Sequence, residues 1–136
     1  MIYLYAILNL LIVIVVKAFY DKSQIDKGIR ILHSKEWFIM AITSSPAIYL
    51  LGHEIGKWYG YAIAAVLCMV FIWCFFDALL NKLRGKPLSY AGVITVNSSW
   101  WDKQLNKVAP FWRMAIKITI LIITISVYIL TLWNGK

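Results

Sequence analysis

The stretch Trp73–Gly92, WCFFDALLNKLRGKPLSYAG, decides how this chain folds. It begins inside an apolar run and ends in a basic segment that carries Lys82, Arg84 and Lys86. Lysine and arginine gather on the cytoplasmic side of membrane proteins, close to the ends of transmembrane helices. The change from apolar to basic therefore marks where a transmembrane helix leaves the bilayer, and it indicates the side on which the helix leaves.

The composition of the whole chain is typical of a membrane protein. Of its 136 residues, 62% are hydrophobic, and the mean hydropathy is +0.73. A soluble domain is about 45–50% apolar, and the length allows one transmembrane domain over residues 1–136. The net charge of +8 would suggest nucleic acid in a soluble protein. Here basic loops at a membrane explain the charge, so no nucleic-acid partner is expected.

Apolar runs of transmembrane length predict four helices. A helix needs about 20 apolar residues to cross the hydrocarbon core. The alternative for the first run, a cleaved signal peptide, needs a positive segment before it and a small-residue cleavage site after it, and both are missing. The fold class expected is an all-α integral membrane four-helix bundle, with spans at 2–19, 37–52, 58–80 and 111–133.

The second and third spans are expected to pack closely as a hairpin. The turn at His53–Lys57 is short enough to make them antiparallel neighbours. Small residues such as Gly60 and Ala64 let helix backbones approach closely in a membrane. Pro46 interrupts the second span and removes a backbone donor. It is interpreted as a kink in a packing helix, with a hinge as the functional alternative.

The two long loops are expected to carry short helices at the membrane surface. In the loop 20–36, apolar residues recur at helical spacing, which favours an amphipathic interfacial helix. In the loop 81–110, Ser99 is followed three residues later by Asp102, close to the capping-box pattern that starts a helix. Both helices would lie in the headgroup layer on the same side of the bilayer.

Lysine and arginine are distributed unequally between the two sides of the predicted bundle. Twelve fall on the side of the two long loops: Lys17, Lys22, Lys27, Arg30, Lys35, Lys82, Arg84, Lys86, Lys103, Lys107, Arg113 and Lys117. Only Lys57 and Lys136 fall on the other side. The positive-inside rule therefore predicts cytoplasmic long loops and external termini. Near the bilayer, Arg113 and Lys117 are expected to extend their side chains toward the headgroups.

Polar side chains gather at the cytoplasmic boundary of the predicted bundle. His33 and Glu36 precede the second span, Asp77 and Asn81 close the third span one turn apart, and Asp102 lies in the following loop. Imidazole and carboxylate groups bind zinc or harder divalent cations. One hypothesis is a divalent-cation site formed by His33, Asp77 and Asp102, with Glu36 and Asn81 in support. No other cofactor is expected.

The alternative interpretation of Asp77 is structural. An ionisable residue within a span is a functional candidate by default, yet Asp77 could simply form an ion pair with Arg84, which follows on the same helix face, or with Lys82. The chain contains no HExxH, GxSxG or Walker motif. No catalytic residue is therefore assigned, and the chain is expected not to be an enzyme unless the divalent-cation site exists.

The segment FFDALLNKLRGKPLSYAG resembles a pattern in small uncharacterised membrane proteins encoded in bacterial phage and prophage regions. In that pattern a histidine stands shortly before an earlier span, and an aspartate follows the glycine by about ten residues. The resemblance covers about half of the chain and implies a setting, the bacterial inner membrane or an internal virion membrane, but no activity. The matching positions are His33, Asp77, Asn81, Gly85, Gly92 and Asp102.

The favoured function is a structural or accessory membrane protein, such as a component of a virion membrane or of its assembly. Its partners would be the bilayer, anionic lipid at the basic face, and a second copy of the chain or another membrane protein. The alternatives are a holin-like pore, a membrane-embedded metal-dependent enzyme that uses the His/Asp cluster, and a small transporter subunit.

Overall fold

The described part of the computed structural model is helical throughout. It covers residues 1–29, 33–90, 104 and 107–135, with the side chains of residues 33 and 34 left aside. Within these ranges no strand occurs, which confirms the all-α class there. The helices in chain order are α1 (Ile2–Asp26), α2 (His33–Thr43), α3 (Ser45–Ile55), α4 (Trp58–Leu83) and α6 (Pro110–Gly135).

Three of the helices are long and apolar enough to cross a membrane. They are α1, with 25 residues, and α4 and α6, with 26 residues each. At about 1.5 Å per residue such helices are about 38 Å long, more than the roughly 30 Å of a hydrocarbon core. The predicted spans 58–80 and 111–133 agree with α4 and α6 to within three residues at each end.

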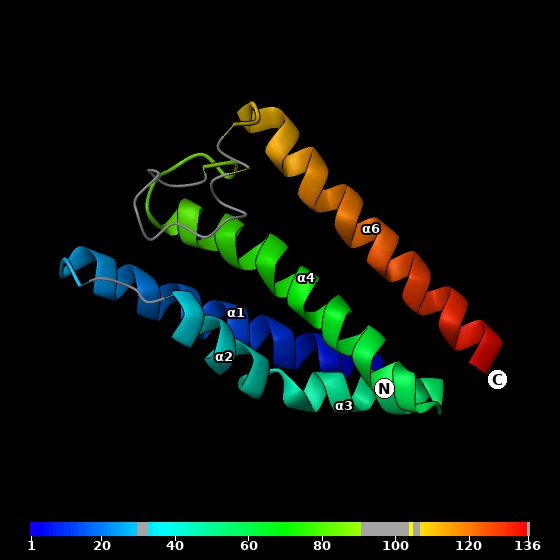
Figure 1. Ribbon diagram of the computed structural model, residues 1–136. Coiled ribbons are helices and arrows are strands. Elements are labelled where there is room, and N and C mark those ends of the chain that lie inside the picture. Colours follow the sequence, from blue (N-terminus) through cyan, green and yellow to red (C-terminus); the bar gives the residue numbers. More distant parts are fainter. Residues whose placement is uncertain (30–32, 91–103, 105–106, 136) are drawn as a thin grey trace.

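Helix α4 is central, because it contacts α1, α3 and α6. Figure 1 shows α1 and α4 lying along each other in the same direction, with α3 beside them and α6 on the other side of α4. Both chain termini lie at the end that holds the α3–α4 turn. The last turn of α1, the first turn of α2 and the last turn of α4 lie at the opposite end, which we call the loop end.

Helix α1 is longer than predicted. The span 2–19 and a separate interfacial helix were expected, but α1 continues without interruption to Asp26. Two ion pairs at i,i+4 spacing, Lys17–Asp21 and Lys22–Asp26, support the additional turns. Gly28, with φ of 71°, then ends the helical path. The interfacial helix expected around Ser99 falls outside the described residues.

The second predicted span is divided into two helices. Helices α2 and α3 meet at Ser44 with a bend of 54°, and Pro46 lies in the first turn of α3. Hydroxyl groups satisfy carbonyls at the break, since Ser44 Oγ donates to Met40 O at 2.7 Å and Thr43 Oγ1 donates to Ile39 O at 2.8 Å. The interruption predicted at Pro46 is therefore present as a break, while movement about it stays a prediction.

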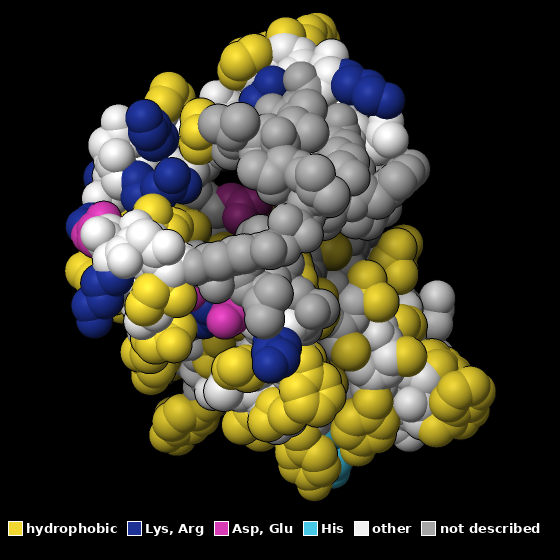
Figure 2. Space-filling view, turned by 60° about the vertical axis from the view of Figure 1, so that its left-hand side comes forward, with side chains coloured by type: hydrophobic (Ala, Val, Ile, Leu, Met, Phe, Trp, Pro, Cys, Tyr) yellow, Lys and Arg dark blue, Asp and Glu magenta, His cyan; other side chains and the backbone are white. Residues whose placement is uncertain are grey.

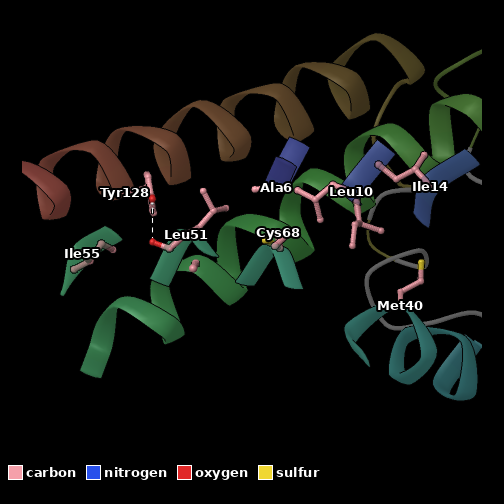
Figure 3. Packing of buried hydrophobic residues seen from close by; sticks show 11 residues of the cluster. Ala6, Leu10, Ile14, Met40, Leu51, Ile55, Cys68 and Tyr128 are labelled. Carbon is pink, nitrogen blue, oxygen red and sulfur yellow. Dashed lines mark hydrogen bonds between the residues drawn. The ribbon is translucent and has the colours of Figure 1, made fainter. Parts of the chain in front are cut away.

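All five described helices contribute to one buried apolar cluster, shown in Figure 3. Tyr128 of α6 reaches into it and donates its hydroxyl to the carbonyl oxygen of Leu51 in α3 at 3.0 Å. This bond attaches the C-terminal helix to the broken pair. The members of the cluster are Ala6, Leu10, Ile14, Met40, Ala47, Leu51, Ile55, Ala64, Cys68, Ile72 and Tyr128.

Helices α3 and α4 approach each other at two glycines. A Cβ atom on Gly52 would lie 2.8 Å from Cα of Tyr61, and one on Gly60 would lie 2.8 Å from the carbonyl oxygen of Gly52. These distances are shorter than any normal carbon contact, so only glycine fits at this backbone separation. The close approach predicted from the small residues at the start of the third span is confirmed.

Candidate functional site

The first candidate site is a buried cluster of three charged side chains between α1 and α2. Lys17 of α1 forms ion pairs with Asp21, one turn further along, and with Glu36 of α2. Lys17 is 7% exposed and Asp21 is 3% exposed. We call these three residues the Lys17 cluster. It was not predicted, because Lys17 was counted with the basic residues of the loop side.

The Lys17 cluster holds one ammonium group against two carboxylates. Taking charges out of water costs several kcal/mol per ion, and close opposite charges with good hydrogen bonds offset that cost. The three donors of the ammonium group suit two acceptors at once. Glu36, expected to support a metal site, is thus part of an ion pair that connects α2 to α1.

The second candidate site connects α4 to α6. Lys117 of α6 forms an ion pair with Asp77 of α4, and its ammonium nitrogen lies 4.8 Å from the ring centroid of Trp73. The thiol of Cys74 lies within 3.4 Å of the carbonyl oxygen of Lys117. Lys117 is only 9% exposed, so the expected extension of its side chain toward the headgroups is wrong.

The ion pair of Asp77 with Arg84 stays a prediction, since the pair that the structure gives for Asp77 is with Lys117. The guanidinium carbon of Arg84 lies 5.8 Å from the ring centroid of Tyr90. A signal for Lys117 was present in the sequence. A lysine several residues inside an apolar run calls for a carboxylate at the same depth, and Asp77 meets that condition.

Asn81 stabilises the segment that follows α4. Its side-chain amide donates to the carbonyl oxygens of Leu88 at 3.2 Å and Tyr90 at 2.7 Å, and Asn81 is 5% exposed. The role expected for it, support of a cation site near Asp77, is not tested by these bonds. They give Asn81 a structural role that the sequence had not suggested.

The divalent-cation hypothesis stays untested. Asp102 and the side chain of His33 lie outside the described residues. In the part of the chain that is described, no three His, Cys, Asp or Glu side chains are grouped so that they could hold a metal ion. Glu36 and Asp77 each have a lysine beside them.

Both sites lie at a similar distance from the loop end. Lys17 precedes the last residue of α1 by nine positions, Asp77 precedes that of α4 by six, and Lys117 follows the first residue of α6 by seven. At about 1.5 Å per residue these distances are about 14, 9 and 10 Å. The ion pairs therefore lie inside the helical part of the molecule, where they join neighbouring helices.

Comparison of the chain with protein-family models, with curated proteins and with solved structures finds no match. The chemistry of the sites is that of paired charges. Of the six acidic residues in the sequence, five have described side chains, and each has a partner. Besides Asp21, Glu36 and Asp77, Asp26 forms an ion pair with Lys22, and Glu54 accepts the hydroxyl of Tyr3 at 3.3 Å.

We expect a double-mutant cycle to show that Asp77 and Lys117 act as a pair. Asp77→Asn or Lys117→Met alone should lower the free energy of unfolding in mixed detergent micelles by about 1–3 kcal/mol, because each leaves a partly buried charge without its partner. The double variant should cost less than the sum of the two. The control is the cycle of Asp77→Asn with Arg84→Met. Additive effects in the first cycle would show that the ion pair contributes nothing.

Proposed function

We propose that this chain is a polytopic integral membrane protein with a structural or accessory role. The observation that carries the role is the pairing of every described acidic side chain within the chain's own helices. Ionisable side chains inside a membrane-spanning bundle face its interior and pair with one another. Here the pairs Lys17–Glu36 and Lys117–Asp77 join one helix to another, as expected of a protein whose task is to hold a defined shape in the bilayer.

We further propose that α2 and α3 together form a fourth span. Each has 11 residues and is about 16 Å long, too short to cross alone. Two such segments joined with a bend of 54° extend about 29 Å from end to end, close to the roughly 30 Å of a hydrocarbon core. The hydroxyls of Thr43 and Ser44, bonded to nearby carbonyls, make an interruption at that depth tolerable.

The proposed orientation places the loop end in the cytoplasm and both termini outside. Figure 2 shows Lys and Arg side chains gathered around this end, with hydrophobic side chains over much of the remaining visible surface. Described lysines and arginines at the loop end include Lys22, Lys27, Lys82, Arg84 and Lys86. Short loops with such an excess remain on the cytoplasmic side.

Helix α6 supports an accessory role in a larger assembly. Of the residues in its most apolar stretch, 11% are buried within the chain, compared with 28% for α1 and 22% for α4. The rest of its surface is available to lipid and to a further membrane helix. The resemblance to phage-encoded membrane proteins gives the proposed setting, a virion membrane or its assembly in the bacterial inner membrane.

Cysteine labelling tests the topology. In a chain with Cys68 and Cys74 replaced by alanine, Lys27→Cys and Lys57→Cys should react with an impermeant maleimide from opposite sides of the membrane, and the position 57 cysteine should react from outside. A re-entrant α2–α3 pair would place both cysteines on the same side and contradict the fourth span. Release of the protein by alkaline carbonate would contradict membrane integration altogether.

Expression of the protein alone tests the structural role against the holin-like alternative. We expect induced bacterial cells to keep their membrane potential for hours, because each described acidic side chain has a partner within the chain and the long helices present apolar surfaces. A potential-sensitive dye would follow the response, with uninduced cells as the comparison. Rapid loss of potential on expression of the wild-type protein would favour a pore.

A further inference from the structure

We propose that the segment after α4 binds the phosphate group of an anionic phospholipid between Arg84 and Lys86, beside the ring of Tyr90. The proposal rests on the proposed function, because only a membrane location supplies the lipid. It goes further than a general attraction of the basic face, since it assigns the contact to one set of residues. We call Arg84, Lys86 and Tyr90 the phosphate clamp.

The backbone that carries the clamp is held in place. Gly85 has φ of 64° and turns the chain directly after α4. The backbone N–H of Lys86 donates to the carbonyl oxygen of Asn81 at 2.9 Å. The side-chain amide of Asn81 donates to the carbonyl oxygens of Leu88 and Tyr90. Asn81 thus closes the segment into a compact turn, and a binding site on it needs little ordering when the ligand arrives.

Two cations converge on one aromatic ring in this turn. The guanidinium carbon of Arg84 lies 5.8 Å from the ring centroid of Tyr90, and the ammonium nitrogen of Lys86 lies 5.7 Å from it. In the described part of the chain, neither side chain forms an ion pair with a carboxylate. Because both cationic groups lie close to the same ring, an anion bound beside Tyr90 is attracted by both charges.

The chemistry of the clamp suits a phosphate group. A guanidinium group binds phosphate through two parallel hydrogen bonds, and an ammonium group adds a compact point charge. A carboxylate could accept the same donors, but the surrounding residues favour an anion that has apolar tails. Leu88 lies between Lys86 and Tyr90 in the sequence and is 49% exposed. The turn therefore presents an apolar side chain next to its basic residues.

The start of α6 places the clamp at headgroup depth. Phe111 is 75% exposed and Trp112 is 59% exposed, as in the aromatic belt that lines membrane interfaces. Arg113 connects this belt to the clamp segment, because its guanidinium donates to the carbonyl oxygen of Ser89 at 3.5 Å. A phospholipid whose phosphate group is bound at the clamp would therefore have its acyl chains beside exposed apolar helix surface. A soluble phosphate compound would gain nothing from that surface.

Native mass spectrometry of the full chain in detergent, with phosphatidylglycerol or phosphatidylcholine added, tests the proposal. We expect the wild-type protein to prefer phosphatidylglycerol. The variant Arg84→Gln/Lys86→Gln should bind phosphatidylglycerol at least about tenfold more weakly, because it loses two charge-assisted contacts. The matched control Lys27→Gln/Lys107→Gln removes the same charge from the loop end without touching the clamp, and it should keep the preference.

Four outcomes would overturn the clamp. The first two are an equal loss of binding in the variant and the control, and no preference for phosphatidylglycerol in the wild-type protein. The third is a thermal unfolding midpoint of the variant in phosphatidylcholine far below that of the wild type. The fourth is binding of soluble glycerol phosphate as tight as that of phosphatidylglycerol. Carbonate extraction distinguishes failure of the phosphate clamp from failure of the proposed membrane function. A protein that resists extraction but shows no lipid preference is still an integral membrane protein without the clamp.

Discussion

Replacing Lys17 with methionine is expected to lower the free energy of unfolding by about 3–5 kcal/mol, the cost of removing one partner from a buried ion pair. Methionine keeps most of the side-chain volume, so the change removes the charge and leaves little cavity. Asp21 and Glu36 would then face each other without the cation that stands between them. Their mutual repulsion in a low-dielectric environment would separate α2 from α1.

The matched control for this variant is Lys22→Met. Lys22 and Asp26 form a pair with the same i,i+4 spacing on the same helix, but their side chains are 34% and 56% exposed. Exposed pairs of this kind contribute about 0.3–0.5 kcal/mol. Unfolding in mixed detergent micelles gives both values, and the triple variant Lys17→Met/Asp21→Asn/Glu36→Gln should recover much of the loss. Equal effects at Lys17 and Lys22 would show that burial adds nothing to the Lys17 cluster.

Alanine at Gly52 or Gly60 is expected to destabilise the protein by about 1–3 kcal/mol, the usual cost of adding a methyl group to a packed interior. The direction of the change in unfolding free energy distinguishes a packed position from an open one. In a helix with free space, Gly→Ala stabilises by up to about 1 kcal/mol through the lower backbone entropy of alanine. At Gly52 the new methyl carbon would lie 2.8 Å from Cα of Tyr61. Helices α3 and α4 would have to move apart.

Ala62→Val is the matched control, since Ala62 lies on α4 near Gly60 but is exposed. It adds volume to the same helix outside the α3–α4 contact and should change the unfolding free energy by less than about 0.5 kcal/mol. The measurement is again unfolding in mixed micelles. An increase in stability for both glycine variants would mean that the two helices are further apart than the structure gives.

The helices themselves were largely predictable from the sequence, because a transmembrane helix is recognised from composition and length alone. The apolar runs that became α4 and α6 needed no knowledge of their neighbours. The end of α1 was harder, since the turns after the predicted span 2–19 are polar and are supported by side-chain pairs along the helix. Pro46 indicated an interruption, but the bend at Ser44 depends on how α3 packs.

The candidate sites were less predictable, because their pairs join residues far apart in the chain. The sequence suggested Arg84, seven positions further along the chain, as a partner of Asp77, whereas the ion pair that the structure gives is with Lys117, forty positions away. Lys17 and Glu36 belong to different helices whose relative rotation no sequence pattern reports. The positions of lysine and arginine along the chain predict the side of the membrane on which each lies. They do not show which lysines turn inward, because packing between helices determines that.

The break between α2 and α3 has a consequence for how the protein is made. A segment enters the bilayer from the translocon when its own transfer free energy is favourable, and halves of 11 residues fall short of the about 20 residues that a crossing helix needs. Helices α2 and α3 would therefore depend on a neighbouring helix for their insertion into the membrane. The turn at Gly56 joins it directly to α4, whose length and apolarity suffice for entry. We expect α4 to draw the pair into the membrane, so that a nascent chain arrested before α4 is complete exposes residues 33–55 to protease.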